Sequence, residues 1–511
     1  MMETKEPIDR RSFAAGDLVL RCEPFVWVLE SDEYQARCAY CLRQSEELRT
    51  CSRCRLHRYC SVTCQSTDWK LEHKLECTLL KTATDSTNGT EHDIIVHSSQ
   101  YGLEVPQELI AKLANKIKLN TMMDIPGMGR KSARDLLSML PANPAQSEYE
   151  QLMSPADMLA WESENSMLTG VPAADVLNYY GLLHYNALYI YDTKFCGVSG
   201  PIGLAVFPQA SLRRMTPVCW DINVLLTFHG RRLFIHAAED IPQYTGLRDL
   251  RYNEHPDPFC QTRAERRAAF EKKFGHPCTC RRCSPECDAE INPLRCVTEG
   301  CSNRIPSDIR AHHACFECGA INRDRLTQFH QFMLRYETIT ASSEMESYSA
   351  MVLQVCMDMD AAGILQPDAH FRYVCGRELP NKYYVECRLE EGLKTIVELV
   401  GCVTACVRKI YPEYSLIRAR LLMSAGLSVV DALPKPMLNI GVDRMSSLDI
   451  QKHDVAAATV WALNMDFCSE ARGILIKLFG KQSKEVQDGD ADCKQAVTKL
   501  LCIQQMLRLR K

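Results

Sequence analysis

Residues 38–77 contain the pattern Cys38-x2-Cys41, Cys51-x2-Cys54, Cys60-x3-Cys64, His73-x3-Cys77. Its four close pairs supply eight soft or borderline ligands, which is enough for two tetrahedral Zn2+ ions. Cysteines that only filled a hydrophobic core would not fall in pairs at turn spacing. The pattern therefore predicts two zinc sites, and metal binding would supply the folding free energy that so small a core lacks.

Length, composition and charge limit the class of protein. The chain has 511 residues, 46% of them hydrophobic, which predicts a globular protein of two to four domains. Its net charge of -4 and pI near 6.4 show no global basic excess, so we expect no nucleic-acid binding. One local basic set is a candidate for such contacts, although a solvated surface also explains it: Arg49, Arg53, Arg55, Arg58, Lys70 and Lys74.

Cysteine usage indicates the compartment. The chain has 27 cysteines behind the polar start Met1-Met2-Glu3-Thr4-Lys5-Glu6, which argues for a reducing environment where thiols bind metal or stay free. We therefore expect the cytoplasm and nucleus. No apolar run reaches the roughly 20 residues that cross a bilayer, so we expect no membrane association.

Strand patterns lie on both sides of the zinc segment. Residues 16–29 have turn residues followed by apolar, β-rich runs that break at Pro24, which predicts two short strands. Further strands are predicted by the apolar runs 188–191, 202–207, 224–228 and 233–237. The zinc segment is therefore expected to be an insertion into a β domain.

Helical periodicity marks other parts of the chain. Helices are predicted at 109–119, 158–167 and 175–185, and from residue 326 onward the pattern is almost wholly helical, as at 384–408 and 456–478. The polar segment 79–100 predicts a loop, and the Gly-containing segment 125–137 predicts a turn that leads into a surface helix.

The pattern of the zinc segment resembles the MYND zinc finger, which has C-x2-C, C-x2-C, Tyr-Cys-x3-Cys and H-x3-C, and every ligand position is matched. This resemblance implies interleaved ligation, with Cys38, Cys41, Cys60 and Cys64 on one zinc and Cys51, Cys54, His73 and Cys77 on the other. A MYND finger inserted into a β domain is the arrangement of the SET and MYND family of protein lysine methyltransferases. The chain resembles this family over nearly its whole length.

The resemblance implies an α+β fold with five parts. We expect a SET-type β domain split between 1–37 and 170–256, a MYND finger at 38–77, a mainly helical insertion at 78–169, a post-SET segment with a zinc ribbon at 257–324, and a C-terminal helical, TPR-like domain at 325–511. We also expect a monomer.

The resemblance implies two residues of a site for S-adenosylmethionine and a lysine substrate. Asn186 stands where the Asn-x-Phe strand of the family contacts the cofactor. Tyr252 stands at about the distance of the catalytic tyrosine that orients the amine.

Three cofactor motifs of the family are not matched. The Gly-x-Gly loop is missing before Ser12, the Asn-His-Ser-Cys loop is replaced by Thr216-Pro217-Val218-Cys219, and the Gly-Glu-Glu-Leu turn is replaced by Tyr244-Thr245-Gly246-Leu247. Substitute hydrogen bonds are expected from His276, as a cofactor-binding residue, or from the pair Asp221 and Asn223.

Two further cysteine groups predict metal sites. Cys278, Cys280 and Cys283 resemble the post-SET pattern, which takes a fourth zinc ligand from upstream; Cys219 is the candidate, with Cys260 and Cys287 as alternatives. The second group resembles a zinc ribbon, with His312 and His313 adjacent, and consists of Cys296, Cys301, Cys315 and Cys318.

Two functions follow from these patterns. The first is a zinc-containing protein lysine methyltransferase that uses S-adenosylmethionine and acts on histone or non-histone lysines. The alternative is a catalytically inactive adaptor, whose finger docks a proline-rich peptide and whose helical domain binds another protein.

Overall fold

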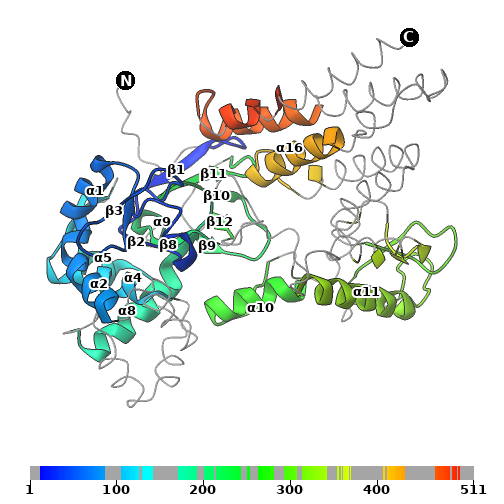
Figure 1. Cartoon of the computed structure of the whole chain (residues 1–511). Helices are drawn as coiled ribbons and strands as arrows, with labels where there is room; N and C mark the ends of the chain where they lie inside the picture. The colour runs from blue at the N-terminus through cyan, green and yellow to red at the C-terminus, as the bar shows by residue number, and fades with distance from the viewer. Residues whose placement is uncertain are drawn as a thin grey trace, which may run out of the picture. The chain divides into compact units, whose positions relative to one another are not determined.

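The structure is a computed structural model of the chain (Figure 1). It describes residues 12–86, 105–125, 129–141, 171–192, 201–211, 215–242, 250–253, 263–280, 293–307, 314–341, 411–431 and 466–483, with residue 283 and short pieces within 351–369, 407–408 and 486–494. The chain divides into two compact units. The first comprises 1–14, 18–256 and 268–278, and the second comprises 15–17, 257–267 and 279–511.

The first unit contains two three-stranded antiparallel sheets, with the orders β1-β11-β10 and β2-β8-β7. The predicted strands between residues 16 and 29 and between 188 and 237 are confirmed. The strands are β1 (Leu18–Cys22), β2 (Val26–Leu29), β7 (Ala187–Ile190), β8 (Gly203–Val206), β10 (Val224–His229) and β11 (Arg232–Ala237). Two-stranded ladders join β3 (Arg49–Thr50) to β4 (Arg58–Tyr59), β5 (Met122–Ile125) to β6 (Gly129–Ser132), and β9 (Thr216–Pro217) to β12 (Arg251–Tyr252).

Strand β2 reads Val-Trp-Val-Leu without a polar residue because both of its faces are buried. Trp27 and Leu29 belong to a core shared with β1, β10, β11 and the finger, here called the sheet–finger core. Val26 and Val28 belong to a second core shared with three helices, here called the sheet–helix core. The indole Nε1 of Trp27 donates to the carbonyl of Ala39 at 3.1 Å, so β2 also holds the start of the finger.

Three helices cover the sheet–helix core: α4 (Gln107–Lys118), α5 (Ala133–Met139) and α8 (Ala173–Asn186) (Figure 1). The predictions of helices at 109–119 and 175–185 are confirmed. Segment 125–137 forms the β5-β6 hairpin followed by α5, which begins with a capping box between Ser132 and Asp135. Its residues 126–128, and the predicted helix 158–167, lie outside the described residues.

Among the described residues of the first unit, the other helical elements include η2 (Ser31–Glu33), α1 (Val62–Asp68), η3 (Trp69–His73), α2 (Lys74–Ser86) and the short α9 (Pro208–Ser211). Two of them, α1 and η3, lie within the finger, and α2 continues past its end. The predicted loop beginning at Leu79 is wrong as far as Ser86. Leu80 is buried in the sheet–finger core, and this packing continues the helix through a polar sequence. α10 (Arg263–Phe274) contains residues of both units.

The second unit combines a small hairpin with helices. The hairpin joins β13 (Leu294–Arg295) to β14 (Arg304–Ile305), and the helices include α11 (Arg323–Ala341), α16 (Leu416–Asp431) and a helical segment at 466–479. The predicted helix 384–408 lies almost wholly outside the described residues, and a TPR-like arrangement stays a prediction. In the part of the chain that the structure describes, no helix has the length and apolarity to cross a membrane.

Gly230, in the turn between β10 and β11, touches the finger. Its φ is +57°, and a Cβ there would clash with the carbonyl oxygen of Cys41. We expect Gly230→Ala to lower the opening free energy of the finger by about 1–3 kcal/mol, measured by hydrogen exchange over 38–77. Gly129→Ala is the matched control, because its φ is +71° but a Cβ there meets nothing within 4 Å. Equal effects of the two variants on the finger would contradict the contact.

Candidate functional site

The first ligand cluster consists of Cys38, Cys41, Cys60 and Cys64, whose sulfurs lie within 4.8 Å of one another. The sulfur of Cys60 is 3.7 Å from that of Cys41 and 3.6 Å from that of Cys64. A zinc ion with Zn–S distances of about 2.3 Å separates neighbouring sulfurs by about 3.8 Å, whereas a disulfide has a bond of about 2.05 Å. The spacing therefore fits four thiolates around one metal ion.

The second ligand cluster consists of Cys51, Cys54, His73 and Cys77, and all four are buried. The sulfurs of Cys51 and Cys77 are 3.8 Å apart, and Nε2 of His73 is 3.3 Å from the sulfur of Cys51 and 3.6 Å from that of Cys54. Burial is the main cause that lowers the pKa of His73 to about 3, which keeps its ring neutral, as a metal ligand must be. These clusters have the interleaved membership that the resemblance implies, and they indicate zinc binding.

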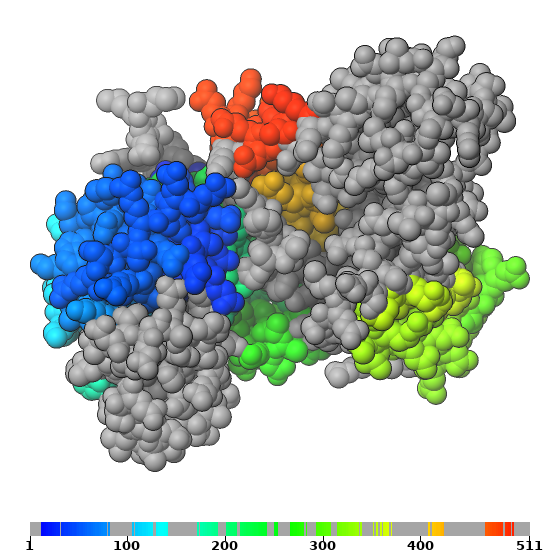
Figure 2. Space-filling model, in the orientation of Figure 1, coloured from blue at the N-terminus to red at the C-terminus, as the bar shows by residue number. Residues whose placement is uncertain are grey.

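Short local elements hold the ligands of the finger. Ser61 caps α1, and its hydroxyl accepts from the N–H of Cys64 at 3.1 Å. Tyr59, fully buried beside Cys60, donates its hydroxyl to Asp68 Oδ2 at 2.7 Å. Ser61 thus fixes the start of α1, and Tyr59 of β4 fixes its end. In Figure 2 the finger, in blue, forms part of a broad exposed surface.

A buried charge network joins the finger to α4. It consists of Glu72 and Glu76 of the finger and Glu108, Lys112 and Lys116 of α4. Nζ of Lys112 lies 3.3 Å from Glu108, 3.6 Å from Glu72 and 3.7 Å from Glu76, and Lys116 pairs with Glu72 at 2.6 Å. Burial alone would lower the pKa of Lys112, but the carboxylates of Glu76, Glu108 and Glu72 raise it above its ordinary value. The lysine is therefore held as a cation inside the protein.

Sequence reasoning missed this network. A signal was present, because Lys112 and Lys116 are four residues apart and fall among the apolar positions Leu109, Leu113 and Ile117 of the same helix. Lysines on an apolar stripe are unusual unless buried carboxylates face them.

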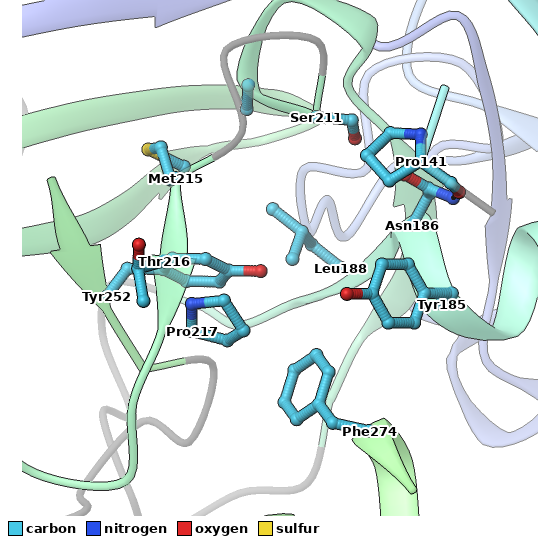
Figure 3. Close-up of a pocket in the computed structure, with 11 residues that line it drawn as sticks. Pro141, Tyr185, Asn186, Leu188, Ser211, Met215, Thr216, Pro217, Tyr252 and Phe274 are labelled. Carbon is cyan, nitrogen blue, oxygen red and sulfur yellow. Dashed lines mark hydrogen bonds between the residues drawn. The ribbon is translucent and has the colours of Figure 1, made fainter. Parts of the chain in front are cut away.

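A cavity of about 400 Å³ lies in the first unit (Figure 3). Residues from helix ends, strand ends and loops line it: Pro141, Tyr185, Asn186, Leu188, Ala210, Ser211, Met215, Thr216, Pro217, Tyr252 and Phe274. The set includes Asn186, one of the residues that the sequence predicts for the cofactor, and Tyr252, which it predicts for catalysis. Cavities of this size with a few polar groups among apolar walls are typical of small-molecule sites.

Asn186 is the last residue of α8 and lies directly before β7. Its side chain is buried, and its Nδ2 donates to the carbonyls of Leu182 at 2.9 Å and Pro141 at 3.0 Å. Both bonds use the amide nitrogen, so Oδ1 is the atom that could accept a hydrogen bond from a ligand.

Tyr252 and Tyr185 face each other across the cavity, with their hydroxyl groups directed toward its middle (Figure 3). Tyr252 lies on the two-residue strand β12, and its carbonyl accepts from the N–H of Val218 at 2.9 Å. Burial raises the pKa of Tyr185, which therefore stays a neutral phenol at pH 7. Sequence reasoning did not single out Tyr185, although it directly precedes Asn186.

The predicted substitutes for the missing cofactor motifs, His276 and the pair Asp221 and Asn223, are not among the residues that line this cavity. His276 is exposed, its ring packs edge-on against Phe270 at 5.4 Å, and it is not among the residues of this cavity; Phe274 lines the wall instead. Asn223 is buried, and its Oδ1 accepts from the N–H of Arg251 at 2.6 Å. Asn223 therefore holds β12, and with it Tyr252, in place.

The cysteines of the predicted post-SET site lie in two pairs. In the first unit, the N–H of Cys219 is 3.4 Å from the sulfur of Cys278, and both residues are buried. In the second unit, the sulfurs of Cys280 and Cys283 are 3.9 Å apart. A shared zinc ion stays a prediction, and the alternatives Cys260 and Cys287 lie outside the described residues.

The predicted zinc ribbon also forms a cluster. The sulfurs of Cys296, Cys301, Cys315 and Cys318 lie within 4.8 Å of one another. His312 and His313, which are adjacent in sequence, are not among the described residues.

Comparison with known proteins gives matches to the finger and to about half of the chain. A family model described as the MYND finger matches residues 38–77. The N-lysine methyltransferase SMYD2 of Homo sapiens is 25% identical over 277 residues, which cover 53% of this chain and 56% of that protein. The N-lysine methyltransferase SMYD2-A of Xenopus laevis is 26% identical over 294 residues, which cover 54% of this chain and 57% of that protein. The chain thus spans about half the length of the curated relatives it matches.

Proposed function

We propose that this chain, a relative of the SET and MYND domain protein lysine methyltransferases, transfers a methyl group from S-adenosylmethionine to a lysine of a histone or another protein. The observation that carries the proposal is the cavity, on which Asn186 and Tyr252 converge from distant parts of the sequence. The proposal includes a SET-type β domain around this cavity, two zinc ions in the finger and one in the post-SET segment. The cytoplasm and nucleus are the proposed compartments.

The walls of the cavity fit a positively charged methyl donor. Tyr185, Tyr252 and Phe274 contribute aromatic faces, which attract cations, and two of them add phenol oxygens. S-adenosylmethionine would supply the methyl group on a sulfonium. Oδ1 of Asn186 would accept a hydrogen bond from S-adenosylmethionine. Pro217, which also lines the cavity, stands where the family has a polar residue.

The reaction needs a neutral amine in line with the methyl group. Apolar walls such as Leu188 and Met215 disfavour the charged ammonium, so they promote loss of its proton before attack. The hydroxyl of Tyr252 would then accept an amine hydrogen and orient the lone pair, which is the kind of positioning that accelerates a displacement. S-adenosylmethionine would supply the methyl group: its S–CH3 bond would break as the N–CH3 bond forms, leaving a neutral thioether and a methylammonium product.

Calorimetry with the zinc-loaded full chain tests the proposal. We expect a saturable heat on titration with millimolar S-adenosylmethionine, and transfer of labelled methyl groups to lysine in histones or other proteins. Absence of both would sink the proposal in favour of the adaptor alternative, in which the finger docks a proline-rich peptide.

Removing the Asn186 side chain should weaken cofactor binding. A hydrogen bond to a charged ligand contributes about 1.5–3 kcal/mol, so Asn186→Ala should raise the Kd for S-adenosylmethionine by about 10-fold or more. Asn178→Ala is the matched control, because Asn178 is exposed on the same helix. Thermal melting shows whether the lost bonds to Leu182 and Pro141 disturb the fold. An unchanged Kd for Asn186→Ala would remove this residue from the site.

A further inference from the structure

The ribbon cysteines of the second unit have the geometry of a metal site. The sulfurs of Cys296 and Cys318 are 3.6 Å apart, as are those of Cys301 and Cys315. A tetrahedral metal with Zn–S distances of about 2.3 Å requires sulfur separations of about 3.8 Å, and a disulfide would require about 2.05 Å. The four side chains are therefore arranged around a common centre and are not paired covalently.

The backbone around the cysteines turns toward the sulfurs. The N–H of Gly319 bonds to the carbonyl of Cys315 at 2.9 Å, and Gly319 takes a φ of +69° just after Cys318. The side chain of Asn303 donates to the sulfur of Cys315 at 3.1 Å. Zinc binds cysteines as thiolates, so a donor directed at this sulfur suits a ligand position.

Asn322 connects the cysteine loops to helix α11. It is completely buried, and its Oδ1 accepts from the N–H of Val297, beside the ligand Cys296, at 2.8 Å. Its Nδ2 donates to the carbonyl of Ala320 at 2.9 Å, and its own carbonyl accepts from the N–H of Leu326 in the first turn of α11 at 3.1 Å. Asn322 therefore ties both cysteine pairs to the start of this helix, through its side chain on the cysteine loops and through its backbone carbonyl on α11.

The hairpin is too small to fold by its own core. Its strands have two residues each, and the described buried core adds Leu326 and Phe329 of α11 to Leu294 and Ile305 of the hairpin. Figure 1 shows the hairpin beside α11. Modules of this size usually need a metal ion or disulfides for stability.

We propose that Cys296, Cys301, Cys315 and Cys318 bind a structural zinc ion that fixes Asn322 and thereby the start of α11. The site is separate from the finger and from the cavity of the first unit, and it is independent of methyl transfer. It would make the first helix of the C-terminal region depend on metal.

Substitution of Cys318, the exposed ligand, tests this inference in the full chain. Metal content is measured by elemental analysis, and protection of residues 323–341 by hydrogen exchange. We expect Cys318→Ser to lose one zinc per chain and to speed exchange in α11. We expect Cys318→His, which restores a zinc ligand, to recover both.

The control is Cys468→Ser, because Cys468 is a buried cysteine of the same unit whose sulfur lies 4.0 Å from Sδ of Met423. It should keep the full zinc content. An unchanged zinc content in Cys318→Ser, iron in place of zinc, or a histidine variant no better than the serine variant would each overturn the assignment. Zinc loss without faster exchange in α11 would overturn the role in positioning this helix.

Asn322→Ala separates metal binding from helix positioning. Because Asn322 is not a ligand, this variant should keep its zinc but lose protection in the first turn of α11. If the first turn of α11 stays fully protected from exchange in this variant, Asn322 does not connect the zinc site to the helix, and that part of the proposal is wrong.

Discussion

Replacing Tyr252 by phenylalanine should lower the rate of methyl transfer by roughly 100- to 1000-fold. The hydroxyl is the part of Tyr252 that points into the middle of the cavity, so its loss would remove the group that we propose orients the amine (Figure 3). The backbone of Tyr252 keeps its bond from Val218, and the strand pairing of β12 with β9 does not need the hydroxyl. The effect should appear in kcat, while the Kd for S-adenosylmethionine stays nearly unchanged.

The matched control is Tyr179→Phe, because Tyr179 is a half-buried tyrosine of α8 that packs against the sheet–helix core and is not among the residues of the cavity. It should retain full activity. A Tyr252→Phe variant that is as active as the unchanged chain would contradict the catalytic role, and an equal loss in both variants would point to a general effect on folding.

Replacing Lys112 by methionine should destabilise the first unit by about 3–5 kcal/mol. Burial opposes ionisation of Glu108, but Lys112 and His57 lower its pKa below the ordinary value, so Glu108 is buried as a carboxylate. Methionine matches the length of the lysine stem but leaves this charge without its main partner. Thermal or urea unfolding measures the loss of unfolding free energy, and hydrogen exchange over residues 38–118 shows whether it falls on the finger and α4.

Two further variants interpret that result. Lys118→Met is the matched control, because Lys118 is exposed on the same helix, and it should change stability by less than about 0.5 kcal/mol. The double variant Lys112→Met with Glu108→Gln should recover part of the loss, because it removes the Glu108 charge that loses its main partner in the single variant. A single variant that costs less than about 1 kcal/mol would contradict the view that the network holds the finger against α4.

The finger was the most predictable part of the chain because metal coordination fixes residue type and spacing at once. Eight ligand positions leave few alternatives, and the structure gathers them in the two sets that the resemblance implies. The strands were predictable for a similar reason, since buried runs such as Val26–Leu29 admit few polar residues.

The surroundings of the cavity were less predictable. Asn186 and Tyr252 were recognised by their place in a family pattern, whereas Tyr185 enters the site only because α8 ends one residue later. His276 was also chosen by its place in that pattern, but it is not among the residues that line this cavity, whereas Phe274 at the end of α10 is. Side-chain direction at the end of an element depends on packing, which a single sequence does not state.

The buried charges of α4 also depend on packing that a single sequence does not state. Lys112 and Lys116 look like solvated residues by composition, and their partners Glu72 and Glu76 belong to another element. Only tertiary packing reveals that opposite charges meet. The prediction of a loop at 79–86 failed in the same way, because burial of Leu80 continues helix α2 through a polar sequence.

Interleaved ligation also makes the finger indivisible. A cut between Cys54 and Tyr59 would leave two ligands of each metal ion on either fragment, Cys38 with Cys41 and Cys51 with Cys54 on one, and the complementary pairs on the other. Neither fragment could complete a coordination shell, so no half of the finger is a metal-binding unit that could be exchanged, duplicated or grafted alone. Any recombination that preserves function must move residues 38–77 as one block.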